Sequence, residues 1–155
     1  MNPRNQHGFT IIELVVVIAL LGLLAAVAVP RFADLSTNAR AASFDGISGG
    51  FTSAIGIAHS MWLASGGTGT VISMEGGQTV AMNTNGWPTL DAANAGQDTG
   101  AELYSVIMQG PIDTTIWTVS ETAAAGAGTA TFVLNGLATG NTFQYNAATG
   151  LVTYP

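Results

Sequence analysis

The chain has 155 residues with neither cysteine nor lysine, and it carries a net charge of −6. Its length allows one domain with an appended element, and the lack of cysteine excludes disulfides, thiolate metal sites and a cysteine nucleophile. The three arginines, Arg4, Arg31 and Arg40, lie near the N-terminus, whereas the acids lie mostly downstream. An acidic chain without a basic patch is not expected to bind nucleic acid.

The first predicted element is an apolar run over residues 9–29 that contains one charge, Glu13. Because about twenty apolar residues span a bilayer, a plain membrane anchor is one interpretation. A second is a secretory signal peptide, with Arg4 as its basic region and residues 26–28 as a small-residue cleavage site. Pro30 just beyond that site and Glu13 at the start of the apolar core argue against it. A carboxylate in a bilayer costs at least about 2.5–3.5 kcal/mol, so Glu13 is expected to have a partner.

A third interpretation accounts for more of these residues. Gly8 is followed by Phe9, by Glu13 four residues later and by an apolar helix, and this helix contains Gly22 and Pro30. This order resembles the N-terminus of type IV pilins and pseudopilins, in which a short polar leader precedes the helix. The resemblance covers the cut site, the acid and the two helix breakers in register, and so it is specific.

The resemblance implies a leader peptide of residues 1–8. A prepilin peptidase and methyltransferase would cut between Gly8 and Phe9 on the cytoplasmic side and methylate the new amine of Phe9. The carboxylate of Glu13 would lie about one helical turn from that ammonium. The two charges could neutralise each other within one chain, or between neighbouring subunits of a filament, as the resemblance implies.

The same resemblance predicts function and location. Residues 28–40 are similar to pilins of the mannose-sensitive haemagglutinin (MSHA) type, which predicts a structural subunit of an extracellular type IV pilus that supports adhesion. Gly22 and Pro30 would take part in assembly, since the segment between them tends to lose helix in such filaments. The implied partners are other copies of the chain, the processing enzyme, the pilus assembly machinery and the inner membrane that holds the precursor. A pseudopilin or minor pilin of a type II secretion system is one alternative, and a membrane-anchored or secreted single-domain binding protein is another.

Downstream of Pro30 the apolar pattern becomes amphipathic. One face collects apolar side chains at spacings of three and four, which is typical of a helix: Phe44, Ile47, Phe51, Ile55, Ala58 and Trp62. Phe32, Leu35, Ala39 and Ala42 form an earlier stripe with the same spacing. These patterns predict one helix from Phe9 to Ala64, ended by the glycines that follow. Glycine weakens a helix, so a break near Gly49 and Gly50 is the alternative.

The remaining chain predicts short strands joined by turns. Strands are expected over residues 70–74, 78–82, 115–120, 129–135, 142–145 and 151–154, with a short helix over 100–109. The predicted fold class is therefore α+β, with a long N-terminal helix packed on a small antiparallel sheet. The predicted organisation is a leader (1–8), an apolar half-helix for the membrane or filament core (9–30), an amphipathic half-helix (31–65) and a β-rich head (66–155).

The C-terminal region must be fastened without the disulfide that many pilins have. Strand pairing, packing of Phe132, Phe143 and Tyr145, or a metal ion are the possible means. The three tryptophans, Trp62, Trp87 and Trp117, are expected in the core or in turns, with exposed adhesive aromatics as the alternative.

A metal site and a catalytic site find little support in the sequence. Asp91 and Glu102 stand at positions 1 and 12 of a calcium-loop spacing, but positions 3 and 5 are alanines, so an EF-hand is excluded. A looser calcium site formed by Asp91, Asn94, Asp98 and Glu102 is a weak candidate, and no other cofactor is expected. His59 is expected to be a partly buried spacer, and no motif predicts an enzyme.

Overall fold

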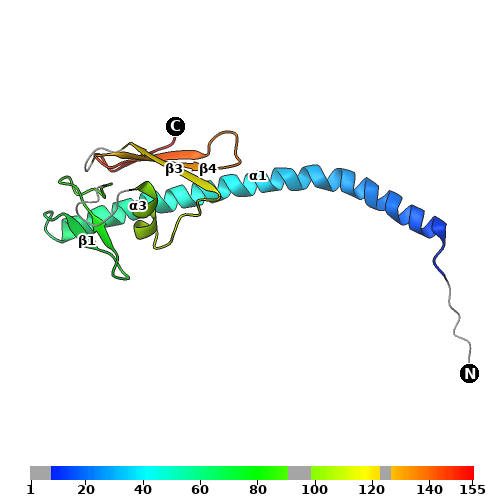
Figure 1. The fold of residues 1–155 in the computed structure, drawn as a ribbon, viewed down its shortest axis with the longest axis horizontal. Helices are drawn as coiled ribbons and strands as arrows, with labels where there is room; N and C mark the ends of the chain where they lie inside the picture. Colours follow the sequence, from blue (N-terminus) through cyan, green and yellow to red (C-terminus); the bar gives the residue numbers. More distant parts are fainter. Residues whose placement is uncertain (1–7, 91–98, 123–126) are drawn as a thin grey trace, which may run out of the picture. The chain divides into compact units, whose positions relative to one another are not determined.

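The computed structural model describes residues 8–90, 99–122 and 127–155 and divides the chain into two compact units, Met1–Ala39 and Arg40–Pro155 (Figure 1). One helix, α1, runs from Ile11 to Ala64 without interruption. The predicted long helix is thus confirmed, and the alternative break near Gly49 and Gly50 is not observed. The helix begins two residues later than predicted because Thr10 takes the capping position before it.

Two glycines end α1, as the sequence predicts. Gly66 and Gly67 have φ values of 107° and 67°, in the left-handed region that residues with a Cβ disfavour. The N–H of Gly66 donates to the carbonyl of Leu63 and the N–H of Gly67 donates to that of Trp62, both at 3.1 Å. These bonds satisfy carbonyls that the last helical turn would otherwise leave without donors.

The predicted apolar face of α1 is the face that packs against the head. Phe44, Phe51, Ile55, Ala58 and Trp62 are buried, and Ile47 is half-buried. The earlier stripe behaves differently, since Phe32 is 72% exposed and Leu35 is 65% exposed. Only the second of the two predicted stripes therefore contributes to the core.

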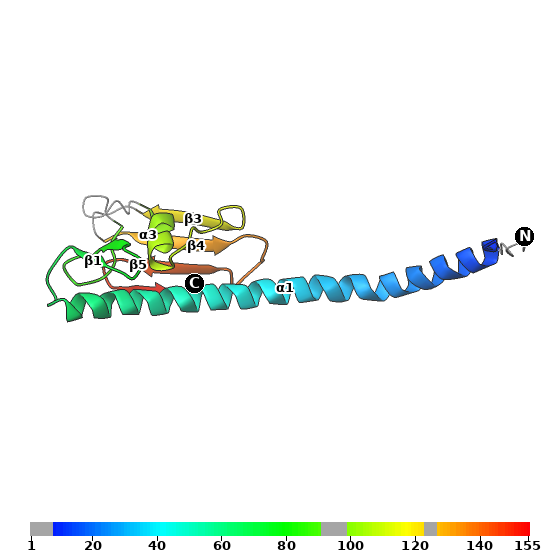
Figure 2. The ribbon, with the colours of Figure 1, turned by 90° about the horizontal axis from the view of Figure 1, so that it is seen from below.

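The strands form two antiparallel sheets, which confirms the α+β fold class. A small sheet pairs β1 (Val71–Ser73) with β2 (Thr79–Ala81). A larger sheet has the order β3-β4-β5-β6, with strands Trp117–Thr122, Thr129–Leu134, Thr142–Asn146 and Leu151–Thr153 (Figure 2). Every connection within this sheet is a hairpin between neighbouring strands, so its pairing is local in the sequence.

The strand β3 begins two residues later than predicted because a side chain closes a turn before it. The carboxylate of Asp113 accepts bonds from the N–H of Thr115 at 2.9 Å and from its hydroxyl at 2.6 Å. The carbonyl of Asp113 also accepts a bond from the N–H of Trp117. These hydroxyl and amide donors hold the pKa of the Asp113 carboxyl below its usual range. An aspartate that bonds to the backbone two residues on competes with strand formation.

The short helix α3 (Gly100–Ile107) lies on the larger sheet. Thr99 and Glu102 form a reciprocal capping box, in which each side chain accepts a bond from the backbone N–H of the other. Gly100 is required here because a Cβ at this position would lie 2.7 Å from the Cβ of Ala130 on β4. Leu103, Tyr104 and Ile107 of α3 are buried.

Aromatic rings fill the core between α1 and the larger sheet. Phe51 is fully buried and contacts the rings of Tyr104, Phe132, Phe143 and Tyr145, with centroids 5.4–6.0 Å apart. Phe132 on β4 and Phe143 on β5 stack at 4.6 Å. Packing of these residues, one of the predicted means of fastening the C-terminal region without a disulfide, is thus observed.

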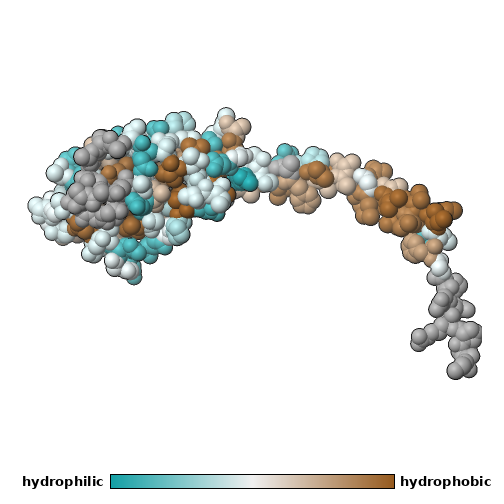
Figure 3. All heavy atoms as spheres, viewed as in Figure 1, coloured by the Kyte–Doolittle hydropathy of each residue, from teal (hydrophilic) through white to brown (hydrophobic). Residues whose placement is uncertain are grey.

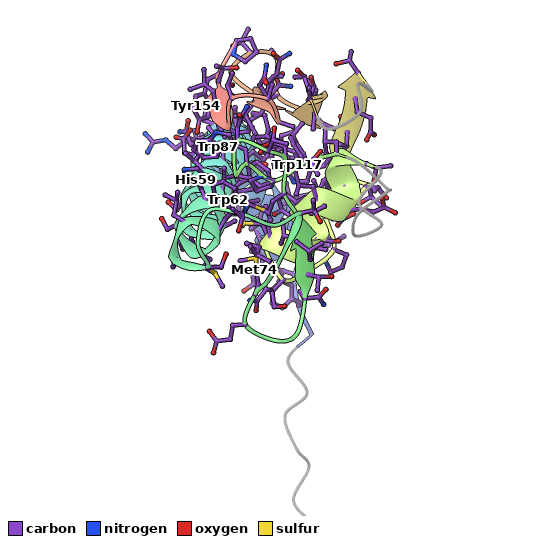
Figure 4. The ribbon with its side chains drawn as sticks, turned by 90° about the vertical axis from the view of Figure 1, so that its left-hand side faces the viewer. His59, Trp62, Met74, Trp87, Trp117 and Tyr154 are labelled. Atoms are coloured by element: carbon purple, nitrogen blue, oxygen red, sulfur yellow. The ribbon has the colours of Figure 1, made fainter. Side chains whose placement is uncertain are left out.

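A second means of fastening is the loop of residues 83–88, which follows the small sheet. Its Trp87 ring stacks on His59 of α1 with centroids 3.9 Å apart, and Figure 4 shows Trp62 beside this pair. The Nδ1 atom of His59 lies 2.6 Å from the carbonyl oxygen of Gly86, and a carbonyl only accepts, so this nitrogen donates. His59 is therefore a half-buried packing residue, as expected.

The same loop is tied to the C-terminal strands. The Tyr145 hydroxyl on β5 donates to the carbonyl of Pro88 at 2.6 Å, and burial raises the pKa of this tyrosine. The amide of Asn83 donates to the carbonyl of Ala147, which precedes β6. The loop thus bridges α1 and the end of the sheet. Trp62 and Trp117 are buried, so the alternative of exposed adhesive tryptophans is wrong for these two.

We expect Gly150→Ala to destabilise the head far more than Gly140→Ala. Both glycines have a positive φ, 70° and 65°, so alanine costs about 1 kcal/mol of strain at either position. A Cβ at Gly150 would also overlap the Trp87 ring, whereas a Cβ at Gly140 meets open space. Overpacking adds about 1–3 kcal/mol at Gly150. Urea unfolding of the two full-length variants in detergent measures the difference, and equal losses would contradict the role of the 83–88 loop.

Candidate assembly site at the N-terminus

The candidate site lies at the start of α1, where Glu13 is held by the residue that caps the helix. The carboxylate oxygen Oε2 of Glu13 accepts a bond from the backbone N–H of Thr10 at 2.8 Å and from its hydroxyl at 2.7 Å. The hydroxyl oxygen of Thr10 lies 3.3 Å from the backbone nitrogen of Glu13, whose N–H donates to it. This reciprocal arrangement is a capping box, and it also places a negative charge near the positive end of the helix.

Thr10 is the site residue that the sequence interpretation missed. Its signal is present, because a threonine followed three residues later by a glutamate before an apolar run is typical of a helix start. The bond partner of Glu13 in a single chain is thus Thr10, adjacent to the predicted cleavage site. Gly8 and Phe9 precede the helix, and Phe9 is 75% exposed.

The surface that follows Glu13 is apolar on all sides. From Ile11 to Val29 the large apolar side chains are 45–80% exposed, and the spheres of this part of α1 are brown in Figure 3. Within the described ranges, α1 is the one helix that is long and apolar enough to cross a membrane. A helix that is apolar all round is stable only when lipid or other apolar surfaces cover it.

The other predicted assembly residues lie farther along the same helix. Gly22 and Pro30 are about 14 and 26 Å from Glu13 along the axis, at 1.5 Å per residue. The helix continues through both. Nothing lies within 4 Å of a Cβ built at Gly22, so no contact inside the chain requires a glycine there. Pro30 has no N–H and leaves one carbonyl of the preceding turn without its usual donor.

Most of the weak calcium candidates fall outside the residues that the structure describes. Asp91, Asn94 and Asp98 lie outside the described ranges, and the Glu102 carboxylate caps α3. Among the residues that the structure describes, no three acidic or histidine side chains are grouped as metal ligands would be. A calcium site in this loop stays a prediction.

Comparison with known proteins points to the same end of the chain. The family model described as the prokaryotic N-terminal methylation motif matches residues 3–29. The chain is 49% identical over 54 residues to the type IV narrow pilus major component PilA5 of Thermus thermophilus, a match that covers 35% of this chain and 47% of that protein. It is 54% identical over 35 residues to the type IV major pilin PilE1 of Neisseria gonorrhoeae, covering 23% and 21% of the two chains.

One relative matches beyond the helix. The fimbrial protein EcpC of Eikenella corrodens is 29% identical over 119 residues, which cover 71% of this chain and 78% of that protein. No solved structure gives a significant match to the chain. The matches to PilA5 and PilE1 span less than half of those proteins. In its N-terminal motif and in these relatives the chain is similar to type IV pilins, and its long helix with antiparallel sheets is consistent with that similarity.

Proposed function

We propose that this chain is the precursor of a structural subunit of an extracellular type IV pilus. The observation that carries the proposal is Glu13, a single carboxylate at the start of an exposed, wholly apolar helical surface. Such a surface suits the inner membrane before assembly and the packed interior of a filament afterwards. In both settings an uncompensated carboxylate is costly, so the site calls for a cation.

Cleavage between Gly8 and Phe9 supplies that cation. A prepilin peptidase that cuts this bond, and then methylates the amine, leaves an ammonium one residue before Thr10. Thr10 already holds the Glu13 carboxylate with two donors, which lowers the cost of its charge in a single subunit. In the filament the ammonium of a neighbouring subunit takes over as the partner of Glu13. The ion pair sets the register between subunits, while the apolar side chains supply attraction without direction.

The other predicted features belong to the same proposal. Residues 1–8 are the leader, 9–30 the filament core, 31–65 the amphipathic half-helix and 66–155 the head. The segment between Gly22 and Pro30 loses helix on assembly, since Pro30 already lacks one helical bond. The filament serves adhesion as a pilus of the MSHA type. Pilins are structural proteins, so no catalytic task is proposed for the chain.

Isolation of surface filaments tests this function. Filaments sheared from cells that produce the chain should contain it as their principal subunit, and its removal should abolish them. A chain present at only a few copies in each filament would indicate a minor pilin. Loss of protein secretion with no loss of surface filaments would indicate a pseudopilin. A chain that stays in the membrane, with neither defect on its removal, would indicate an anchored binding protein.

A further inference from the structure

Two Asn-Gly pairs occur in the chain, Asn85-Gly86 and Asn135-Gly136. In such a pair the backbone nitrogen of glycine can attack the side-chain carbonyl of asparagine, because glycine has no Cβ to hinder the approach. The product is a cyclic imide that water opens to aspartate or isoaspartate. The reacting dipeptide is the same in both pairs, so a difference in reactivity that disappears on unfolding comes from the fold.

The Asn135-Gly136 pair lies in the turn after β4, and both residues are exposed. The hydroxyl of Thr118 on β3 donates to Oδ1 of Asn135 at 3.0 Å. This bond draws electrons from the amide carbon and would stabilise the oxyanion that forms when the carbon is attacked. Among the described residues, the N–H of Gly136 donates to no acceptor. The electrophile is thus activated, and the nucleophilic nitrogen is free.

The backbone around Asn135 is fixed on both sides. Its N–H donates to the carbonyl of Ile116 at 2.8 Å, and its carbonyl accepts a bond from Nη1 of Arg40 at 3.1 Å. The turn is therefore held at the end of the sheet by β3 and by α1. Arg40 is the only cation of the unit Arg40–Pro155, whose remaining charges are acidic.

In the Asn85-Gly86 pair, by contrast, the glycine is buried and its N–H is already hydrogen-bonded. Gly86 is buried, and its N–H donates to the carbonyl of Asn83 at 3.0 Å. A Cβ at Gly86 would overlap the Trp62 ring, so this backbone is packed against an aromatic face. The backbone N–H of Asn85 in turn donates to Oδ1 of Asn83 at 2.9 Å. The glycine nitrogen must leave its bond and its packing before it can attack.

We infer that Asn135-Gly136 is a site of spontaneous deamidation and that Asn85-Gly86 is protected. The Gly136 N–H gives its proton to water and the nitrogen forms a bond to Cγ of Asn135. The bond from Cγ to Nδ2 breaks, and ammonia leaves with a proton taken from water. One further water then hydrolyses the imide. The net change consumes one water, releases one ammonia and one proton, and creates a carboxylate at position 135.

The two products differ in their effect on the head. An aspartate at position 135 keeps the backbone, including the bond from Arg40 to its carbonyl, and adds a negative charge. An isoaspartate adds a methylene to the main chain at a residue whose N–H and carbonyl are both bonded, which loosens the contact with Arg40. The reaction thus gives an ageing subunit an additional negative charge at one defined turn.

Mass spectrometry of the full chain, folded in detergent at mildly alkaline pH, tests this inference. The peptide that contains Asn135 should gain one mass unit roughly tenfold faster than the peptide that contains Asn85, which must first give up a buried hydrogen bond. In urea the two rates should converge. Thr118→Val should slow the reaction at Asn135 several-fold and leave Asn85 unchanged.

Three results would overturn it. If Asn85 deamidates as fast as Asn135 or faster in the folded chain, the 83–88 loop does not protect it. A difference that persists in urea would assign the effect to sequence and not to the fold. If Thr118→Val leaves the deamidation rate of Asn135 unchanged, the Thr118 hydroxyl does not activate the amide.

Discussion

Glu13→Ala should abolish assembly while leaving the leader cleaved and the subunit in the membrane. The substitution removes the carboxylate that would face the Phe9 ammonium of a neighbouring subunit, and that ammonium is then left uncompensated among apolar side chains. Removing one partner of a buried ion pair costs about 3–5 kcal/mol, so a loss of filaments of at least about a hundredfold is expected. Quantifying sheared filaments against the cellular pool of cleaved chain measures this ratio.

Two further variants separate the charge of Glu13 from its capping role. Glu13→Gln keeps an acceptor for the N–H of Thr10, because glutamine also completes a capping box, but it removes the charge. If the ion pair controls assembly, Glu13→Gln should fail as badly as Glu13→Ala. Filaments at the normal level from Glu13→Gln would show that only the cap matters. Glu75→Ala, which removes an exposed acid of the head, serves as the control and should assemble normally.

Phe51→Ala should cause the largest loss of stability of any single truncation in the unit Arg40–Pro155. Its ring is fully buried and contacts four aromatic rings from α3, β4 and β5. Truncation of a buried phenylalanine costs about 3–5 kcal/mol, from lost burial and from the cavity that remains. This is a large fraction of the total stability of a typical domain, about 5–15 kcal/mol.

Phe32→Ala is the matched control, since it makes the same substitution in the same helix at a side chain that is 72% exposed. Thermal unfolding of both full-length variants in detergent, followed by circular dichroism in the aromatic region, measures the difference. Phe32→Ala should unfold within a few degrees of the parent chain. Similar midpoints for the two variants would contradict the assignment of the core to the second stripe of α1.

The sequence predicted the elements whose pattern is local and regular. The 3–4 spacing from Phe44 to Trp62 predicted the buried face of α1, and glycines after Ala64 predicted its end. Strand positions followed from alternation between turn residues. The error at β3 has a local cause, because the Asp113 carboxylate and Thr115 form a turn that β-propensity alone does not reveal.

Contacts between distant segments could not be predicted. The stack of Trp87 on His59 and the bond from Tyr145 to Pro88 join residues far apart in the sequence, and neither has a periodic signal. At the assembly site, by contrast, the sequence contains a local signal for the capping residue as well as for the unusual acid. Glu13 was identified as the unusual charge, and Thr10 three residues earlier is the capping partner that its spacing already indicated.

A cut between Gly8 and Phe9 is expected to create the partner of Glu13. The mass and N-terminal sequence of the mature chain, isolated from cells with a prepilin peptidase, test this claim most directly. We predict a chain that begins at Phe9 with a methylated amine. A chain that begins at Val29 would show signal-peptide cleavage, and an intact Met1 would show a plain anchor; either result would contradict the account.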